Sequence, residues 1–194
     1  MQPVAVRIIR EEHSAMAAVL YSLRYLVRKI GEGDKPDFRL LRAMLDYVVE
    51  YPERWHHPKE NDYLFATLRE RSKEAVPVIE ALEAEHVRGD RMVKELTRAL
   101  IRYETGGDAE YAAFAAAVEA FDDFHWKHMR KEEEVLLPLA EQSLTDTDWR
   151  KIGDAFLEND NPLFGLKPKE MSEELFQRIL TLAPPPLGVG AEKT

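Results

Sequence analysis

The chain has 194 residues, of which 45% are hydrophobic and 32% are charged. This length and composition predict one soluble globular domain with a full core. The formal net charge of -9 argues against nucleic acid and anionic membrane surfaces as partners, since both require a basic protein surface. The absence of cysteine excludes disulfides, thiolate zinc sites and cysteine-bound iron–sulfur clusters.

Residues 1–13 contain no apolar region of the kind found in signal peptides, and no run approaches the length of a membrane-spanning helix. These features, with the absence of cysteine, lead us to expect a cytoplasmic protein. Any bound metal must be held by nitrogen and oxygen atoms, because there is no thiolate. The sequence predicts no particular oligomeric state.

Apolar residues at helical spacing, separated by glycine, proline and capping residues, predict an all-α protein. Four long helices are expected, over residues 6–30, from 37 or 38 to about 71, from the 72–77 region to 103, and from 108 to about 142. Pro52 and Pro58 are expected to kink the second helix, the alternative being two separate helices. The short connections predict an antiparallel up-down-up-down four-helix bundle over residues 1–143.

Beyond residue 143 the pattern changes, and residues 144–194 are predicted to form a short helical extension. Its two helical candidates are 146–157 and 169–182. The extension has too few apolar residues for a core of its own, and its end, 184–194, is expected to be frayed.

A histidine–glutamate motif occurs twice. His128 and Glu132 stand four positions apart, which places them on one face of a helix. His56 and Glu60 have the same spacing 72 positions earlier, and a pair of large apolar residues follows each copy at the same distance. The two copies predict two helices that present matched imidazole and carboxylate groups to one place.

A second repeat, with a spacing of 73 positions, relates Glu12 and His13 to Glu85 and His86. Matched apolar residues surround both copies, so each histidine lies within the apolar stripe of its helix, and such a stripe must face a core. Glu12 and Glu85 stand at the edge of the stripe, where they can accept a histidine N–H or pair with arginine.

These four histidines and two glutamates are expected to converge in the core, where unpaired carboxylates are unfavourable without a cation. Imidazole and carboxylate suit iron, manganese, zinc or copper. Two bridging glutamates with two histidines for each ion fit the two-fold repeat better than a single ion does. The candidate metal ligands are His13, His56, Glu60, His86, His128 and Glu132.

Three residues near these ligands are candidates for an extra ligand or for a hydrogen bond to one. His125 falls in the same wedge of its helix as the ligands, and both direct ligation and a hydrogen-bonding role stay open. Glu53 is its partner in the repeat. His57 lies 100° around the helix from His56, which predicts a place at the rim or on the surface.

Asp90, one turn after His86, could orient that imidazole, although an ordinary polar role is the simpler interpretation. Glu133 and Glu134 turn away from the ligand wedge, and we expect both to be exposed to solvent.

The chain resembles the hemerythrin-like (HHE cation-binding) family over roughly residues 1–143, in the segments Glu11-Glu12-His13, His56-His-Pro-Lys-Glu60, Glu85-His86 and His128-Met-Arg-Lys-Glu132. The resemblance implies an antiparallel four-helix bundle around two iron ions in an oxo- or hydroxo-bridged non-haem centre, with other divalent metals as alternatives. It implies the four histidines as terminal ligands and the two glutamates as bridges.

One departure from the family pattern concerns the third helix. Oxygen-carrying hemerythrins have a second histidine there, four residues before or after the first, where this chain has Leu82 and Asp90. Four histidines and two glutamates suffice in the subgroups that sense iron or oxygen, or that repair iron–sulfur centres after nitrosative stress. The repair proteins also share a cysteine-bearing N-terminal segment, and this chain has no cysteine.

Two classes of function follow, and the sequence leaves both open. The first is a di-iron binding protein that takes up dioxygen or nitric oxide for sensing, carriage or storage. The second is a di-iron enzyme. A ferritin-like oxidase or a peroxide-handling protein is suggested by Glu53-x-x-His56, which matches the Glu-x-x-His element of carboxylate di-iron bundles, and iron–sulfur repair is suggested by the family resemblance. A third hypothesis is a structural bundle with an adventitious ion.

Overall fold

The computed structural model describes residues 2–157, 177–185, 187 and 188. Every regular element in this part of the chain is helical, which confirms the all-α prediction. None of these helices combines the length and the apolarity that a bilayer crossing requires. The elements are α1 (Val4–Gly31), α2 (Phe38–Tyr51), η1 (Pro52–His56), α3 (His57–Lys59), η2 (Glu60–Phe65), α4 (Ala66–Arg71), α5 (Val76–Gly106), η3 (Gly107–Glu110), α6 (Tyr111–Lys131), η4 (Glu132–Leu136), α7 (Leu137–Ser143) and α8 (Asp146–Leu157).

Capping and turn residues set the helix ends close to their predicted positions. The side chain of Asp37 accepts hydrogen bonds from the backbone N–H groups of Arg39 and Leu40 at the start of α2. Gly107 follows α5 with a φ of 71°, a conformation that glycine adopts without strain.

The second helical segment runs without a break from α2 to α4, so the alternative of two separate helices is wrong. Its interruptions are two π-helical turns, η1 from Pro52 and η2 from Glu60. Pro52 has no N–H group, so the regular ladder of hydrogen bonds cannot continue through it. A third π-helical turn, η4, begins at Glu132 between α6 and α7. All three turns contain predicted metal ligands, in keeping with the frequent use of such turns at functional sites.

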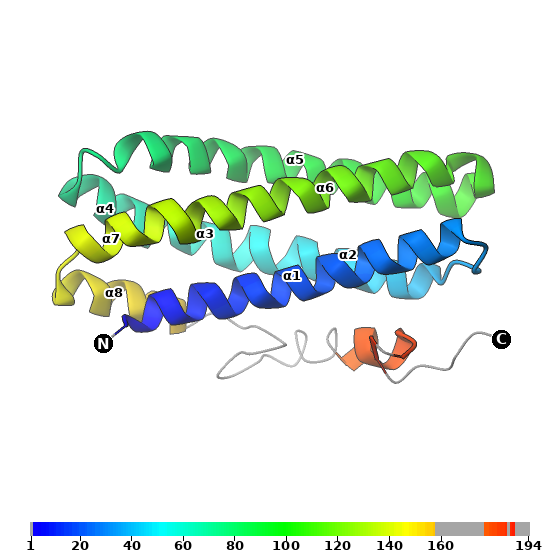
Figure 1. Ribbon diagram of the computed structural model, residues 1–194, viewed down its shortest axis with the longest axis horizontal. Coiled ribbons are helices and arrows are strands. Elements are labelled where there is room, and N and C mark those ends of the chain that lie inside the picture. Colours follow the sequence, from blue (N-terminus) through cyan, green and yellow to red (C-terminus); the bar gives the residue numbers. More distant parts are fainter. Residues whose placement is uncertain (1, 158–176, 186, 189–194) are drawn as a thin grey trace.

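Four helical segments lie along the long axis of the molecule (Figure 1). The contacts between them close a ring, in which α1 touches α2, α2 touches α5, α5 touches α6 and α6 touches α1. Each segment therefore has two neighbours and turns one face toward a shared interior.

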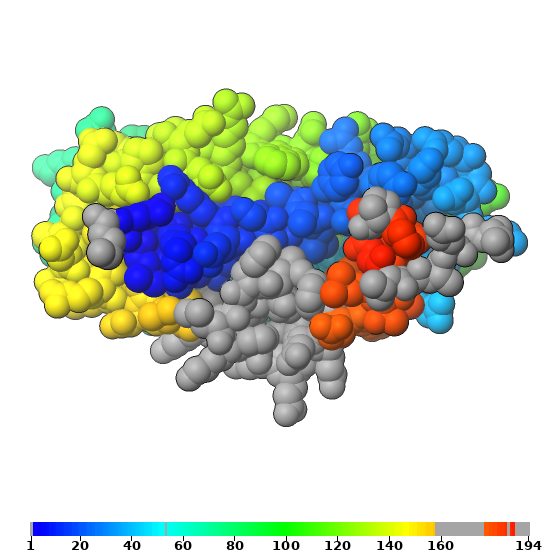
Figure 2. All heavy atoms as spheres, turned by 60° about the horizontal axis from the view of Figure 1, so that its bottom comes forward, coloured from blue at the N-terminus to red at the C-terminus, as the bar shows by residue number. Residues whose placement is uncertain are grey.

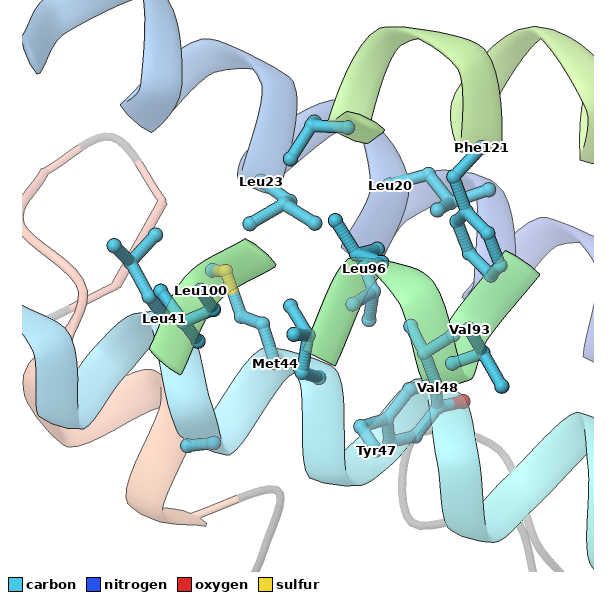
Figure 3. Close-up of a cluster of buried hydrophobic side chains, with 14 of the residues drawn as sticks. Leu20, Leu23, Leu41, Met44, Tyr47, Val48, Val93, Leu96, Leu100 and Phe121 are labelled. Carbon is cyan, nitrogen blue, oxygen red and sulfur yellow. The ribbon is translucent and has the colours of Figure 1, made fainter. Parts of the chain in front are cut away.

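The interior contains two apolar clusters with a polar layer between them. On α1, the smaller cluster ends at Ile9 and the larger cluster begins at Met16, and His13 lies between the two. His86 has the corresponding place on α5. Figure 3 shows the larger cluster, where side chains from α1, α2, α5 and α6 pack together. Each fully buried leucine or phenylalanine contributes roughly 1.5–3 kcal/mol, and the clusters thereby offset the cost of burying the polar layer.

Helix α8 packs on the bundle, beside α1 (Figure 2). Ile152 and Phe156 are buried in the smaller apolar cluster. Arg71, the last residue of α4, donates two hydrogen bonds of 3.1 and 3.0 Å to the carboxylate of Asp148. The predicted helix over 146–157 is confirmed, and its apolar face completes the core of the bundle.

The described C-terminal residues also contact the bundle. Residues 177–182 are helical, Ile179 is buried in the larger apolar cluster, and Leu187 packs against that cluster. The remainder of the second helical candidate and most of the predicted tail lie outside the described residues. The division of the chain at residue 143 stays a prediction.

Candidate metal centre

All six predicted metal ligands are buried in the polar layer. Both glutamates have an exposed fraction of 0%, and none of the four histidines exceeds 6%. The structure brings together His13 from α1, His56 from η1, Glu60 from η2, His86 from α5, His128 from α6 and Glu132 from η4.

The side chains form two adjacent groups, and within each group the ligand atoms lie within 4.8 Å of one another. The first group is His13, His56, Glu60 and Glu132, and the second group is His57, Glu60, His86 and His128. Glu60 belongs to both groups. Glu132 also approaches the second group, since its Oε1 atom lies 3.3 Å from Nε2 of His128.

Each carboxylate directs one oxygen at each group. Oε1 of Glu60 lies 3.2 Å from Nε2 of His56, and Oε2 lies 3.5 Å from Nε2 of His86. Oε2 of Glu132 lies 3.2 Å from Nε2 of His13 in the first group, while its Oε1 atom faces the second. Carboxylates oriented in this way can bridge two metal ions.

Each of the four predicted histidine ligands uses its Nδ1 atom to donate a hydrogen bond to a side-chain oxygen. Because carboxylate and amide oxygens accept these bonds, Nδ1 carries a proton and Nε2 is left to face the group. This arrangement is typical of metal-bound histidine. The pairs are His13 with Glu133 at 2.9 Å, His56 with Glu12 at 2.5 Å, His86 with Asn61 at 2.9 Å and His128 with Glu85 at 3.1 Å.

Several polar atoms of the two groups have no hydrogen-bond partner within the described part of the chain. They include Nε2 of three histidines and all four carboxylate oxygens, and all are buried. Imidazole nitrogens and carboxylate oxygens lie 3.2–3.7 Å apart here. They repel each other unless a proton or a metal cation lies between them. A set of nitrogen and oxygen donors with these distances fits a metal centre.

Without a metal, the two carboxylates draw protons onto the imidazoles. Burial lowers the pKa of His13, but the carboxylates of Glu132 and Glu133 outweigh it and raise this pKa to about 9. Burial also lowers the pKa of His86, but Glu132 and Glu60 raise it to about 9. Burial and Glu60 raise the pKa of Glu132, yet the surrounding imidazoles lower it to about 2. The site keeps its carboxylates ionised and requires positive charge beside them.

The prediction that His57 lies at the rim or on the surface is wrong. Its ring is only 6% exposed and stacks on the ring of His86, with centroids 4.1 Å apart. The prediction assumed 100° per residue, whereas the π-helical turns on either side of His57 let both it and His56 face the polar layer. The signal in the sequence is a pair of adjacent histidines enclosed by Pro52 and Pro58.

Two of the other candidates, His125 and Asp90, belong to neither group. His125 is buried, and its Nδ1 atom donates a hydrogen bond of 3.0 Å to the backbone carbonyl of Phe121. Asp90 is half-exposed and pairs with Lys94 at 2.6 Å, so it has the ordinary polar role rather than orienting an imidazole. The side chain of Glu53 lies outside the described part of the structure.

Asn61 was missed as a hydrogen-bond partner of a predicted ligand, and Glu133 was wrongly expected to turn away to solvent. Each directly follows a candidate bridging glutamate and accepts a hydrogen bond from a histidine. The signal that could have found them is the repeat itself, because positions 61 and 133 are 72 apart. Of the two roles left open for Glu12 and Glu85, both residues have the first, since each accepts a histidine N–H group.

A cavity of about 20 Å³ lies beside the two groups, with Met16, Tyr51, His125 and Met129 in its lining. Glu12, Pro52 and histidines of both groups complete the lining. Its volume suits one water molecule or a ligand of similar size.

The fold and the site define an all-helical protein with buried histidine and carboxylate groups that could hold metal ions. The model of the Hemerythrin HHE cation binding domain family matches residues 4–140 of this chain. The chain therefore belongs to the hemerythrin HHE cation-binding family, as the resemblance predicted. A search of curated proteins found no match. The family match ends within α7, so α8 lies beyond it.

Proposed function

We propose that this protein holds two iron ions and binds dioxygen, or a related small ligand such as nitric oxide, in an antiparallel up-down-up-down four-helix bundle. The ring of contacts among α1, α2, α5 and α6 supports this arrangement. Membership of the family and a donor set of nitrogen and oxygen support iron. The cytoplasmic location stays a prediction.

In this proposal, Glu60 and Glu132 would bridge the two ions. The remaining ligands are His13 and His56 for one ion, and His57, His86 and His128 for the other. His57 supplies the histidine that oxygen-carrying hemerythrins have on their third helix and that this chain lacks there. His13 and His56 would give their ion one protein ligand fewer than the other ion has, which would leave room there for the external ligand.

The observation that carries the proposal is the orientation of the two buried carboxylates, each of which directs one oxygen at each histidine group. A single ion uses such a carboxylate on one side only, whereas two adjacent ions use both oxygens. The cavity of about 20 Å³ supports a diatomic ligand rather than a larger substrate.

Loading the protein with ferrous iron under anaerobic conditions, followed by exposure to air, tests this function. We expect two iron ions per chain and a visible charge-transfer band that changes when azide is added. Glu60→Gln should lose iron and the band, whereas Asp62→Asn, an exposed acid two positions away, should retain both. A colourless wild-type protein without bound iron would rule the proposal out. Turnover of hydrogen peroxide that disappears in His56→Ala would favour the enzyme alternative.

A further inference from the structure

His125 is a buried histidine that belongs to neither metal-binding group. Its side chain lies on α6, three positions before His128, and is 2% exposed. The Nδ1 atom lies 3.0 Å from the carbonyl oxygen of Phe121. A carbonyl oxygen can only accept, so Nδ1 carries the proton and Nε2 is a hydrogen-bond acceptor.

The acceptor atom of His125 has no hydrogen-bond partner among the described residues. A buried polar atom without a partner costs free energy, and such an atom in a native structure calls for a ligand or a water molecule. His125 lines the cavity of about 20 Å³, whose other walls include the thioether side chains of Met16 and Met129. The cavity therefore has room for about one water-sized molecule, and His125 forms part of its wall.

The ring of His125 is held in a fixed orientation. Phe121 packs on it with ring centroids 4.0 Å apart, and Phe124 meets it edge-on at 5.2 Å. Burial, foremost, lowers the pKa of His125 to about 4, so the ring is neutral at pH 7. Nε2 thus keeps its lone pair under ordinary conditions.

We propose that Nε2 of His125 accepts a hydrogen bond from a small ligand in this cavity that carries a proton, such as water, hydroxide or hydroperoxide. It thereby favours these ligands over azide and other small anions that can only accept hydrogen bonds. The ligand's attachment to a metal ion rests on the proposed function, whereas the acceptor role of His125 rests on its own geometry.

Azide binding to the air-oxidised, iron-loaded protein tests the proposal, because azide must displace the water or hydroxide that His125 stabilises. His125→Leu, which has a similar volume and no acceptor, should bind azide roughly threefold to tenfold more tightly, the range expected for one lost hydrogen bond. His125→Gln, which keeps an acceptor, should stay near the wild type. Asp90→Asn, on the surface beside Lys94 and outside the cavity, is the control and should bind azide as the wild type does. Unchanged or weaker azide binding in His125→Leu would overturn the proposal.

A second measurement requires neither iron nor a variant. Nitrogen NMR of the imidazoles in the diamagnetic, zinc-loaded protein should show the His125 proton on Nδ1, with Nε2 unprotonated and shifted by a hydrogen bond. A proton on Nε2, or an Nε2 resonance free of any hydrogen bond, would overturn the proposal. If the wild-type protein takes up no iron and shows no azide-sensitive band, the proposed function fails, and the NMR result alone decides the role of His125.

Discussion

The Nδ1 atom of His56 donates a hydrogen bond of 2.5 Å to Oε2 of Glu12, across a separation of 44 positions in the chain. Oε1 of Glu12 accepts a second bond of 2.5 Å from the hydroxyl of Tyr51. Glu85, at the equivalent position of the repeat, accepts from His128. These two carboxylates therefore fix the orientation of one histidine in each group.

Replacing Glu12 should weaken metal binding although Glu12 belongs to neither group. Glu12→Gln keeps the shape of the side chain but removes its negative charge. That charge orients the His56 imidazole and makes its Nε2 atom more basic. We expect iron affinity to fall by roughly 10–100-fold, measured by competition with a chelator. Glu11→Gln is the matched control, because Glu11 is more exposed and pairs with Arg7. Equal affinities in the two variants would show that the bond to His56 has no such role.

The role of His57 is tested by His57→Leu, which preserves the approximate volume of the side chain. If His57 is a ligand of the ion held with His86 and His128, this ion should bind at least about tenfold more weakly, as expected for loss of a metal contact. The ion held by His13 and His56 should remain bound. Iron stoichiometry and the azide-sensitive band report both effects. Asp90→Asn, on the surface beside Lys94, should behave as the wild type, and an identical result for His57→Leu would exclude ligation.

The repeats of 72 and 73 positions were sufficient to predict which six side chains meet, since equal spacing on equal helices places equivalent residues in equivalent positions. His57 could not be placed in this way. Its position depends on π-helical turns, and a fixed angle of 100° per residue does not describe these. Asn61 and Glu133 could have been found, because they continue the repeat by one position.

The metal-free protein should become less stable as the pH rises from 6.5 to 9. Folding raises the pKa of His13 and of His86 from 6.5 to about 9. Protonation of these imidazoles therefore stabilises the folded state fully below pH 6.5, and this contribution is lost as the pH rises through 9. Thermal unfolding should show a Tm lower by roughly 5 °C or more at pH 9.

The iron-loaded protein is the control for this pH dependence. There the metal cations replace the protons, so the Tm should not fall over the same range. In acid, the contribution of Glu132 to folding stability has the opposite dependence on pH. Its pKa is lowered from 4.5 to about 2, so its contribution is present above pH 4.5 and is lost as the pH falls toward 2. A metal-free Tm that is constant or rises between pH 6.5 and 9 would be inconsistent with these shifts.

Helix α8 should detach more easily when its ion pair with α4 is removed. Asp148 accepts bonds from Arg71 and also from the backbone N–H and hydroxyl of Thr145 at the start of α8. Because Arg71 is half-exposed, we expect Asp148→Asn to cost only about 1 kcal/mol. Hydrogen exchange should become faster in α8 and stay unchanged in α5. Asp154→Asn, an exposed acid on the same helix, is the control, and equal protection of α8 in both variants would refute the role of this pair.

The docking of α8 shows what the sequence could and could not provide. Its start at residue 146 and its helical conformation through residue 157 follow from local apolar spacing and were predicted correctly. The contacts of α8 could not be predicted from the sequence, because the burial of Phe156 and the pairing of Asp148 with Arg71 join distant segments of the chain. The described residues of the extension thus add to an existing core and need no core of their own.

Mössbauer spectroscopy of protein loaded with ⁵⁷Fe and oxidised in air tests the central claim most directly. If Glu60 and Glu132 bridge two adjacent ions, all the iron should appear as a coupled pair of high-spin ferric ions with a diamagnetic ground state. Magnetically isolated ferric ions, or a single ion per chain, would contradict the account.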